Sequence, residues 1–187
     1  MVTDAPMIIY SKGLIIMNTR KIAMIGDTDK ITSKAYGLIR KYIELNSEFM
    51  IGDNKGFDYN MQKYLCDHEH KQVTVYYNIT GEDNNNLEGH AMTRNIHPKY
   101  FVKTGVTVHG WKVQPVLSEH SAKSQKFRSA KYEKMIDDCD ILFLLTDGDK
   151  YKDLIERAKL NGKNIIMQAP DHSGDIWISD ASKRAQL

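Results

Sequence analysis

Two glycines and two aspartates alternate in segment 52–58, where a predicted strand passes into a predicted helix. Gly52 and Gly56 would let the backbone approach a ligand closely. The unpaired N–H groups at a helix start attract phosphate, and Asp53 and Asp58 would add acceptors for sugar hydroxyl groups. The pattern therefore favours a sugar-phosphate site. It is equally typical of an ordinary strand-to-helix turn that Asp or Asn caps.

Two further loops carry the same residue types directly after a predicted strand. Gly26 and Asp27 follow the run 21–26, and Asp147 and Gly148 follow the most apolar run of the chain. If these strands are parallel, their carboxyl ends meet at one edge of the sheet, and the loops should converge on one cleft. Because Asp58 lies in the first turn of its helix, we expect the helix dipole to keep its carboxylate ionised near neutral pH.

The polar helical segment 118–138 holds several basic residues. A solvated helix face is the simplest interpretation of such charges, and a phosphate contact from Arg128 or Lys131 is the alternative. His68 and His70 are two positions apart and do not share a helix face, so no metal site is predicted there.

Short apolar runs alternate along the chain with segments whose apolar residues recur at helical spacing. This alternation predicts an α/β fold of the Rossmann-like kind, mainly a parallel sheet with helices on both faces. The sequence contains neither GxGxxG nor GxxxxGK[ST]. We expect parallel strands at 21–26, 48–52, 73–77, 141–146 and 164–168.

The domain organisation follows from where this alternation starts, breaks and stops. We expect residues 1–20 to form an N-terminal extension or a hairpin, and residues 21–170 to form a single Rossmann-like domain. Within it, an irregular insertion at about 79–120 begins with a polar, turn-forming stretch. The second part of this insertion is consistent either with one or two extra strands or with an excursion over the ligand cleft. Residues 171–187 form a C-terminal tail.

The composition limits the classes of protein to which the chain can belong. The chain has 187 residues and a net charge of +2, so no strong electrostatic field favours binding to nucleic acid or to a membrane. No apolar run is long enough to span a bilayer, and no signal peptide is recognised. Cys66 and Cys139 have no CxxC partner, and both are interpreted as buried, reduced thiols. We expect a cytoplasmic protein without a cofactor.

Three separated stretches together resemble one protein family. The first is Ile-Ala-Met-Ile-Gly-Asp at 22–27. The second covers 51–65, with Ile-Gly-Asp-Asn-Lys-Gly-Phe-Asp before Met-Gln-Lys-Tyr-Leu, and continues in the strand at 73–77. The third runs over 131–148 and is followed by 161–167. In this order they are similar to the SLOG superfamily of mostly microbial and phage-borne proteins. It groups Lonely Guy phosphoribohydrolases, DNA-processing protein A and nucleoside 2-deoxyribosyltransferase-like proteins.

The resemblance implies a Rossmann-like sheet that binds a nucleotide or nucleoside at the carboxyl ends of its strands, and homo-oligomers. Enzymes of this group break or exchange an N-glycosidic bond, whose oxocarbenium-like transition state a carboxylate can stabilise. Carried over by position, the loop residues are Gly26, Asp27, Gly52, Asp53, Gly56, Asp58, Asp147 and Gly148.

The resemblance leaves two functions open. The family usually has a phosphate loop ending in Gly-Thr and a catalytic Glu in the next helix. Here Asp147-Gly148 runs directly into Asp149, and Asp153 and Glu156 are the carboxylates near the catalytic position. An N-glycosidase or deoxyribosyltransferase-like enzyme would use Asp53, Asp58 or Asp153 at the sugar. The alternative is a non-catalytic binder, sensor or sponge of a nucleotide-derived signalling ligand.

Overall fold

The computed structural model describes residues 8–9, 14–15, 19–27, 31–80, 104–119, 124–146, 149–168 and 176–179. Within these ranges the main body is a seven-stranded sheet in the spatial order β6-β5-β4-β3-β7-β8-β9. Its strands are β3 (Lys21–Gly26), β4 (Glu48–Ile51), β5 (Val73–Ile79), β6 (Lys112–Leu117), β7 (Ile141–Leu145), β8 (Asn164–Gln168) and β9 (Ile176–Ser179).

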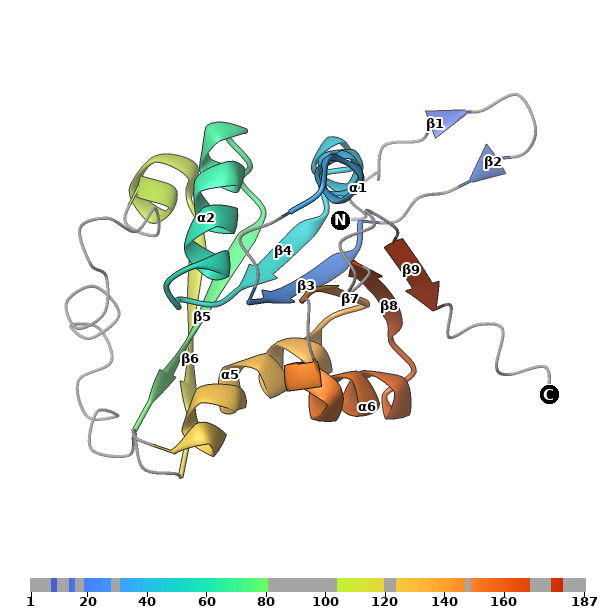
Figure 1. Ribbon diagram of the computed structural model, residues 1–187. Helices are drawn as coiled ribbons and strands as arrows, with labels where there is room; N and C mark the ends of the chain where they lie inside the picture. The colour runs from blue at the N-terminus through green and yellow to red at the C-terminus, as the bar shows by residue number, and fades with distance from the viewer. Residues whose placement is uncertain are drawn as a thin grey trace.

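All neighbouring strands from β6 to β8 pair in parallel, and only β9 runs antiparallel to its neighbour β8. The predicted Rossmann-like α/β fold is therefore confirmed, and each of the five predicted strands is present in the parallel part. Figure 1 shows the sheet from one side, with β6 and β9 at its two edges.

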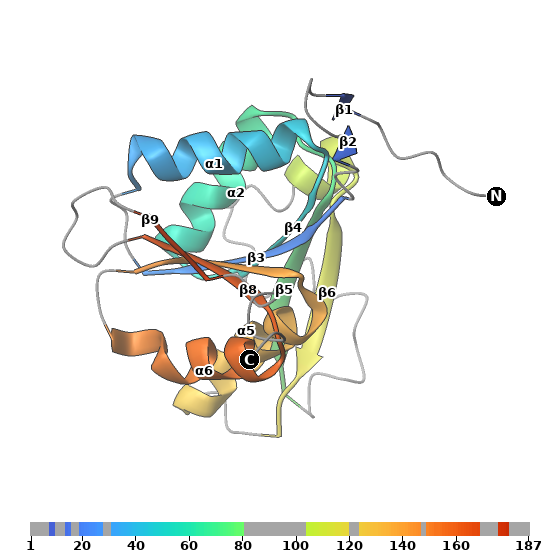
Figure 2. The same ribbon diagram turned by 90° about the vertical axis from the view of Figure 1, so that its right-hand side faces the viewer.

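The helices cover both faces of the sheet. Figure 2 shows α1 (Ser33–Glu44) and α2 (Phe57–Asp67) on one face. On the opposite face lie α5 (Gln125–Asp138) and α6 (Lys152–Leu160). Two short helical turns are also present, the π-helical turn η2 (Gly105–His109) and the 3-10 turn η3 (Asp149–Tyr151).

The central strands are buried on both faces, which explains why they are continuous apolar runs. Along β3, Ile22 and Met24 belong to the core beneath α1 and α2, whereas Ala23 and Ile25 belong to the core beneath α5 and α6. This alternation follows from the two-residue period of a strand. All residues of β7 are buried, so this strand serves both cores.

The connections change direction once across the sheet. From β3 the chain moves outward through β4 and β5 to β6, and then returns to β7, which pairs with the other side of β3. It continues from there to β8 and β9. The carboxyl ends of β3 and β7 thus form the topological switch point, where open α/β sheets bind ligands.

Strands also occur outside the predicted core. Strand β6 lies in the range interpreted as an irregular insertion, and β9 lies in the range interpreted as a tail. Pro115 is compatible with β6 because this strand is at a sheet edge, where only every second backbone N–H is needed for the ladder. Near the N-terminus, β1 (Ile8–Ile9) and β2 (Leu14–Ile15) pair antiparallel. No helix within the described ranges is long and apolar enough to cross a membrane.

Candidate functional site

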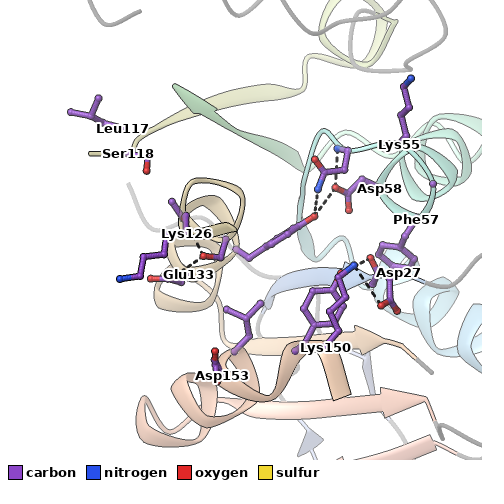
Figure 3. A pocket seen from close by; sticks show the side chains of 18 of the residues that line it. Asp27, Lys55, Phe57, Asp58, Leu117, Ser118, Lys126, Glu133, Lys150 and Asp153 are labelled. Carbon is purple, nitrogen blue, oxygen red and sulfur yellow. Dashed lines mark hydrogen bonds and ion pairs between the residues drawn. The ribbon is translucent and has the colours of Figure 1, made fainter. Parts of the chain in front are cut away.

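A cleft of about 1030 Å³ lies at the carboxyl edge of the parallel sheet (Figure 3). It includes the end of β3, the loop between β4 and α2, the end of β6, the first half of α5 and the start of α6. The described residues that line it are Gly26, Asp27, Asn54, Lys55, Gly56, Phe57, Asp58, Leu117, Ser118, Glu119, Lys126, Ser129, Ala130, Tyr132, Glu133, Lys150, Tyr151, Asp153 and Leu154.

The loop from Gly52 to Gly56 owes its shape to a glycine and to a helix residue. Gly56 caps α2 with φ 83° and ψ −118°, a conformation that residues with a Cβ atom rarely adopt. The backbone N–H of Asn54 donates to Oδ2 of Asp58 at 3.0 Å, which ties the loop to the first turn of the helix. The sequence feature predicted to open a ligand site therefore also stabilises its own turn.

Asp58 is an almost completely buried carboxylate of the cleft. It is only 1% exposed, and its Oδ2 accepts a second hydrogen bond from the Tyr132 hydroxyl at 3.2 Å. Its other oxygen, Oδ1, is buried and has no hydrogen-bond partner among the described residues.

Burial raises the pKa of Asp58 to about 6, although Lys131 and the Asn54 hydrogen bond both lower it. The largest influence on this pKa is burial, which disfavours the ionised form and so acts against the stabilisation that the helix dipole was expected to give. With a pKa of about 6, roughly nine tenths of the carboxyl is still ionised at pH 7.

A buried ion pair lies directly behind this loop. The side chain of Lys131 is only 3% exposed and forms an ion pair with Oδ1 of Asp53. Its Nζ also donates to Oδ1 of Asn54 at 3.0 Å. Lys131 therefore neither faces solvent nor lines the cleft, contrary to both interpretations from the sequence. Because a buried ammonium must be paired, it binds the β4–α2 loop to α5.

Two of the predicted glycines are required by close packing inside the protein. A Cβ atom on Gly52 would lie 2.3 Å from Oδ2 of Asp58, and the Gly52 carbonyl accepts a hydrogen bond from Gln62 Nε2 at 2.8 Å. A Cβ atom on Gly26 would lie 2.5 Å from the Leu145 carbonyl oxygen. At Gly52 the missing side chain makes room for Asp58 rather than for a ligand.

The opposite wall joins β3 to η3 and carries aromatic rings. The Tyr151 hydroxyl donates to the carbonyl of Gly26 at 3.1 Å, and Lys150 Nζ lies 3.7 Å from Oδ2 of Asp27. The rings of Tyr132 and Tyr151 have centroids 6.4 Å apart and are nearly perpendicular. Burial raises the pKa of both tyrosines well above the ordinary value, so each remains a neutral hydroxyl.

Most of the predicted site residues that the structure describes lie in or beside this cleft. Gly26, Asp27, Gly56, Asp58 and Asp153 line it. By contrast, Asp53 and Lys131 form an ion pair behind the loop, and the backbone of Gly52 packs against the side chains of Asp58 and Lys131. Asp147 and Gly148 lie outside the described residues, as does the side chain of Arg128, whose backbone belongs to α5.

Sequence reasoning missed the tyrosines and Lys150. Tyr132 has the spacing of a core residue with Met135 and Ile136, and all three do pack in the core beneath α5. No local sequence pattern indicates that the Tyr132 hydroxyl reaches the β4–α2 loop, which is distant in the sequence. Among the described residues no three His, Cys, Asp or Glu side chains are grouped to hold a metal ion.

The fold and the cleft together define a Rossmann-like α/β protein with a polar and aromatic cleft at its switch point. Comparisons of the chain with protein-family models, with curated proteins and with solved structures found no match. The functional argument therefore rests on the residues of the cleft, and the SLOG resemblance remains a hypothesis.

Proposed function

We propose that this protein binds a nucleoside or nucleotide in the cleft and acts on its N-glycosidic bond, as an N-glycosidase or a deoxyribosyltransferase-like enzyme. The observation that carries the proposal is Asp58, a buried carboxylate with a pKa of about 6 at the switch point of the sheet. Strongly perturbed carboxylates in a cleft are concentrated at functional sites. A group with this pKa can exchange a proton near neutral pH.

The remaining walls suit the two halves of a nucleoside. The largely buried rings of Phe57, Tyr132 and Tyr151 border the cleft with apolar atoms that a base could contact, and polar side chains supply partners for a sugar. The volume of about 1030 Å³ is at the upper end of the range for small-molecule sites and suffices for such a ligand.

Asp153 suits the chemical step better than Asp58. It is exposed in the first turn of α6 and lines the cleft, whereas Asp58 is almost completely covered. When the bond from C1′ to the base nitrogen breaks, its electron pair leaves with the base, which takes up a proton. Asp153 would stabilise the positive charge on the sugar. Water then adds its oxygen to C1′ and releases a proton, which replaces the one that the base took up, so that the hydrolysis balances.

A second candidate function is binding without turnover. It is favoured because two of the three predicted catalytic carboxylates are engaged in an ion pair or hydrogen bonds within the protein. Asp53 is paired with Lys131, and Oδ2 of Asp58 accepts bonds from Asn54 and Tyr132. A protein that only captures or senses its ligand needs shape and hydrogen bonds, but no carboxylate poised at the sugar.

The test combines calorimetry with chromatography. The chain is titrated with nucleosides and nucleotides, and the same mixtures are analysed for released or exchanged base. Asp153→Asn should retain affinity and lose turnover. Glu156→Gln should retain both, because Glu156 is exposed on the same helix but does not line the cleft. Binding without turnover by the wild type supports the binding-only candidate. Absence of binding to every compound would overturn the proposal.

A further inference from the structure

We infer that the ligand of the cleft is a nucleoside without a phosphate chain, and that an N–H or O–H group of this ligand donates to Oδ1 of Asp58. This inference rests on the proposed function and narrows its substrate class. The geometry behind it is a buried acceptor without a donor, in a cleft whose described charges and helix ends are unfavourable for phosphate.

The first observation is the unpaired oxygen. Asp58 lines the cleft, and its Oδ1 is buried without a hydrogen-bond partner among the described residues, although Oδ2 has two. Figure 3 shows these two bonds on one oxygen, while the other carries none. Native proteins rarely leave a buried carboxylate oxygen unpaired, because the lost hydration is costly. A donor on the ligand would complete the coordination of Asp58.

The second observation is the charge of the cleft. Among its described lining residues are five Asp or Glu side chains and three lysines, which leaves a net charge of −2 when all are ionised. One of the lysines, Lys150, already lies 3.7 Å from a carboxylate oxygen of Asp27. Lys126 has Glu133 on the same face of α5, two turns further along. This balance disfavours an added phosphate charge.

The third observation concerns the helix ends that could bind phosphate. Both α2 and α6 open onto the cleft, and each has an acidic residue in its first turn, Asp58 and Asp153 respectively. A carboxylate at this position interacts with the positive end of the helix dipole and takes the place that a phosphate would occupy. The strand-to-helix turn at Gly52–Asp58 is therefore better suited to a sugar or base donor than to a phosphate.

The experiment is isothermal titration calorimetry of the full chain at low and high ionic strength. The probes are adenosine, guanosine, cytidine, uridine, their 2′-deoxy forms and the corresponding 5′-mono- and triphosphates. The nucleoside that binds should be bound roughly threefold to tenfold more tightly than its monophosphate at low salt, and more tightly still than its triphosphate. High salt should reduce these differences in affinity, because it screens the repulsion between the phosphate and the carboxylates of the cleft.

The variant Asp58→Asn tests the donor. Its amide can keep the bonds from Asn54 and Tyr132 through its oxygen, which turns the NH2 group toward the ligand donor. Nucleoside affinity should then fall about tenfold or more. Glu156→Gln is the control. It also exchanges a carboxylate for an amide, but at an exposed residue of α6 that does not line the cleft, and it should retain nucleoside affinity. Circular dichroism checks that both variants are folded.

The outcomes separate this inference from the proposed function. If a nucleotide binds as tightly as its nucleoside or more tightly, the phosphate-free ligand class is overturned while the proposed function stands. If folded Asp58→Asn binds the nucleoside like the wild type, Oδ1 is satisfied inside the protein and the inferred contact is overturned. If no compound binds, the proposed function fails and this inference fails with it.

Discussion

The ionised carboxylate of Asp58 should cost the folded protein stability at neutral pH. The side chain is 1% exposed, and burial raises its pKa from 3.8 to about 6. Asp58→Asn replaces it by a neutral group of the same shape, which can accept the hydrogen bonds of Asn54 and Tyr132 through its amide oxygen. We therefore expect this variant to be more stable than the wild type at neutral pH, even though it should bind ligand less well.

The magnitude follows from proton linkage. Because the folded state holds the proton more tightly than the unfolded state, the wild type loses stability as the pH rises from the unfolded pKa of 3.8 to the folded value of about 6. Each pKa unit corresponds to about 1.4 kcal/mol, so the full cost approaches about 3 kcal/mol above pH 7. The advantage of Asp58→Asn should grow by about 2 kcal/mol between about pH 4.5 and pH 7.5.

Urea unfolding at a series of pH values measures this quantity. The informative quantity is how the difference in unfolding free energy between Asp58→Asn and the wild type changes with pH. Effects of the amide that do not depend on pH cancel from this change. Gly37→Ala is the control, because Gly37 is exposed in α1, and a Cβ atom there would have no heavy atom within 4 Å. It introduces no titratable group, so its effect should be the same at every pH. A flat difference for Asp58→Asn over this range would refute the argument that burial raises the pKa of Asp58.

Three further substitutions test the packing around the same carboxylate. Lys131→Met removes a buried cation and should cost about 3 kcal/mol in urea unfolding, as loss of one partner of a buried ion pair does; an unchanged midpoint would show that the pair contributes nothing. Gly52→Ala places a Cβ atom 2.3 Å from Asp58 Oδ2 and should cost about 1–3 kcal/mol. Gly37→Ala, by comparison, should gain about 0.5–1 kcal/mol. Tyr132→Phe removes a hydrogen bond that lowers the pKa of Asp58, so the pKa should rise above about 6 in a carboxyl-carbon NMR titration; a lower value would contradict the assigned bond.

Much of the fold could be predicted from the sequence because its signals are local. A strand buried on both faces must be apolar at every position, and Ile141–Leu145 carries that signature without reference to any partner. The glycine at position 56 likewise predicts a turn, and its positive φ confirms the reason. An edge strand lacks this signature. Its residues are partly exposed to solvent, so they need not be apolar. The pattern of β6, in which exposed residues alternate with partly buried ones around Pro115, left its structure open.

The roles of the charged residues depended instead on contacts between distant parts of the chain. Residues 53 and 131 are separated by 78 positions, and nothing near Lys131 in the sequence indicates that it is paired and buried. The pKa of Asp58 is similarly decided by its burial in the packed chain. The sequence by itself determined the five predicted parallel strands, the helices between them and the loop at 52–58, since these follow from periodicity and turn chemistry. Only the tertiary structure decided which carboxylates lie in the cleft and which are paired behind it, because desolvation and ion pairing are properties of the packed chain.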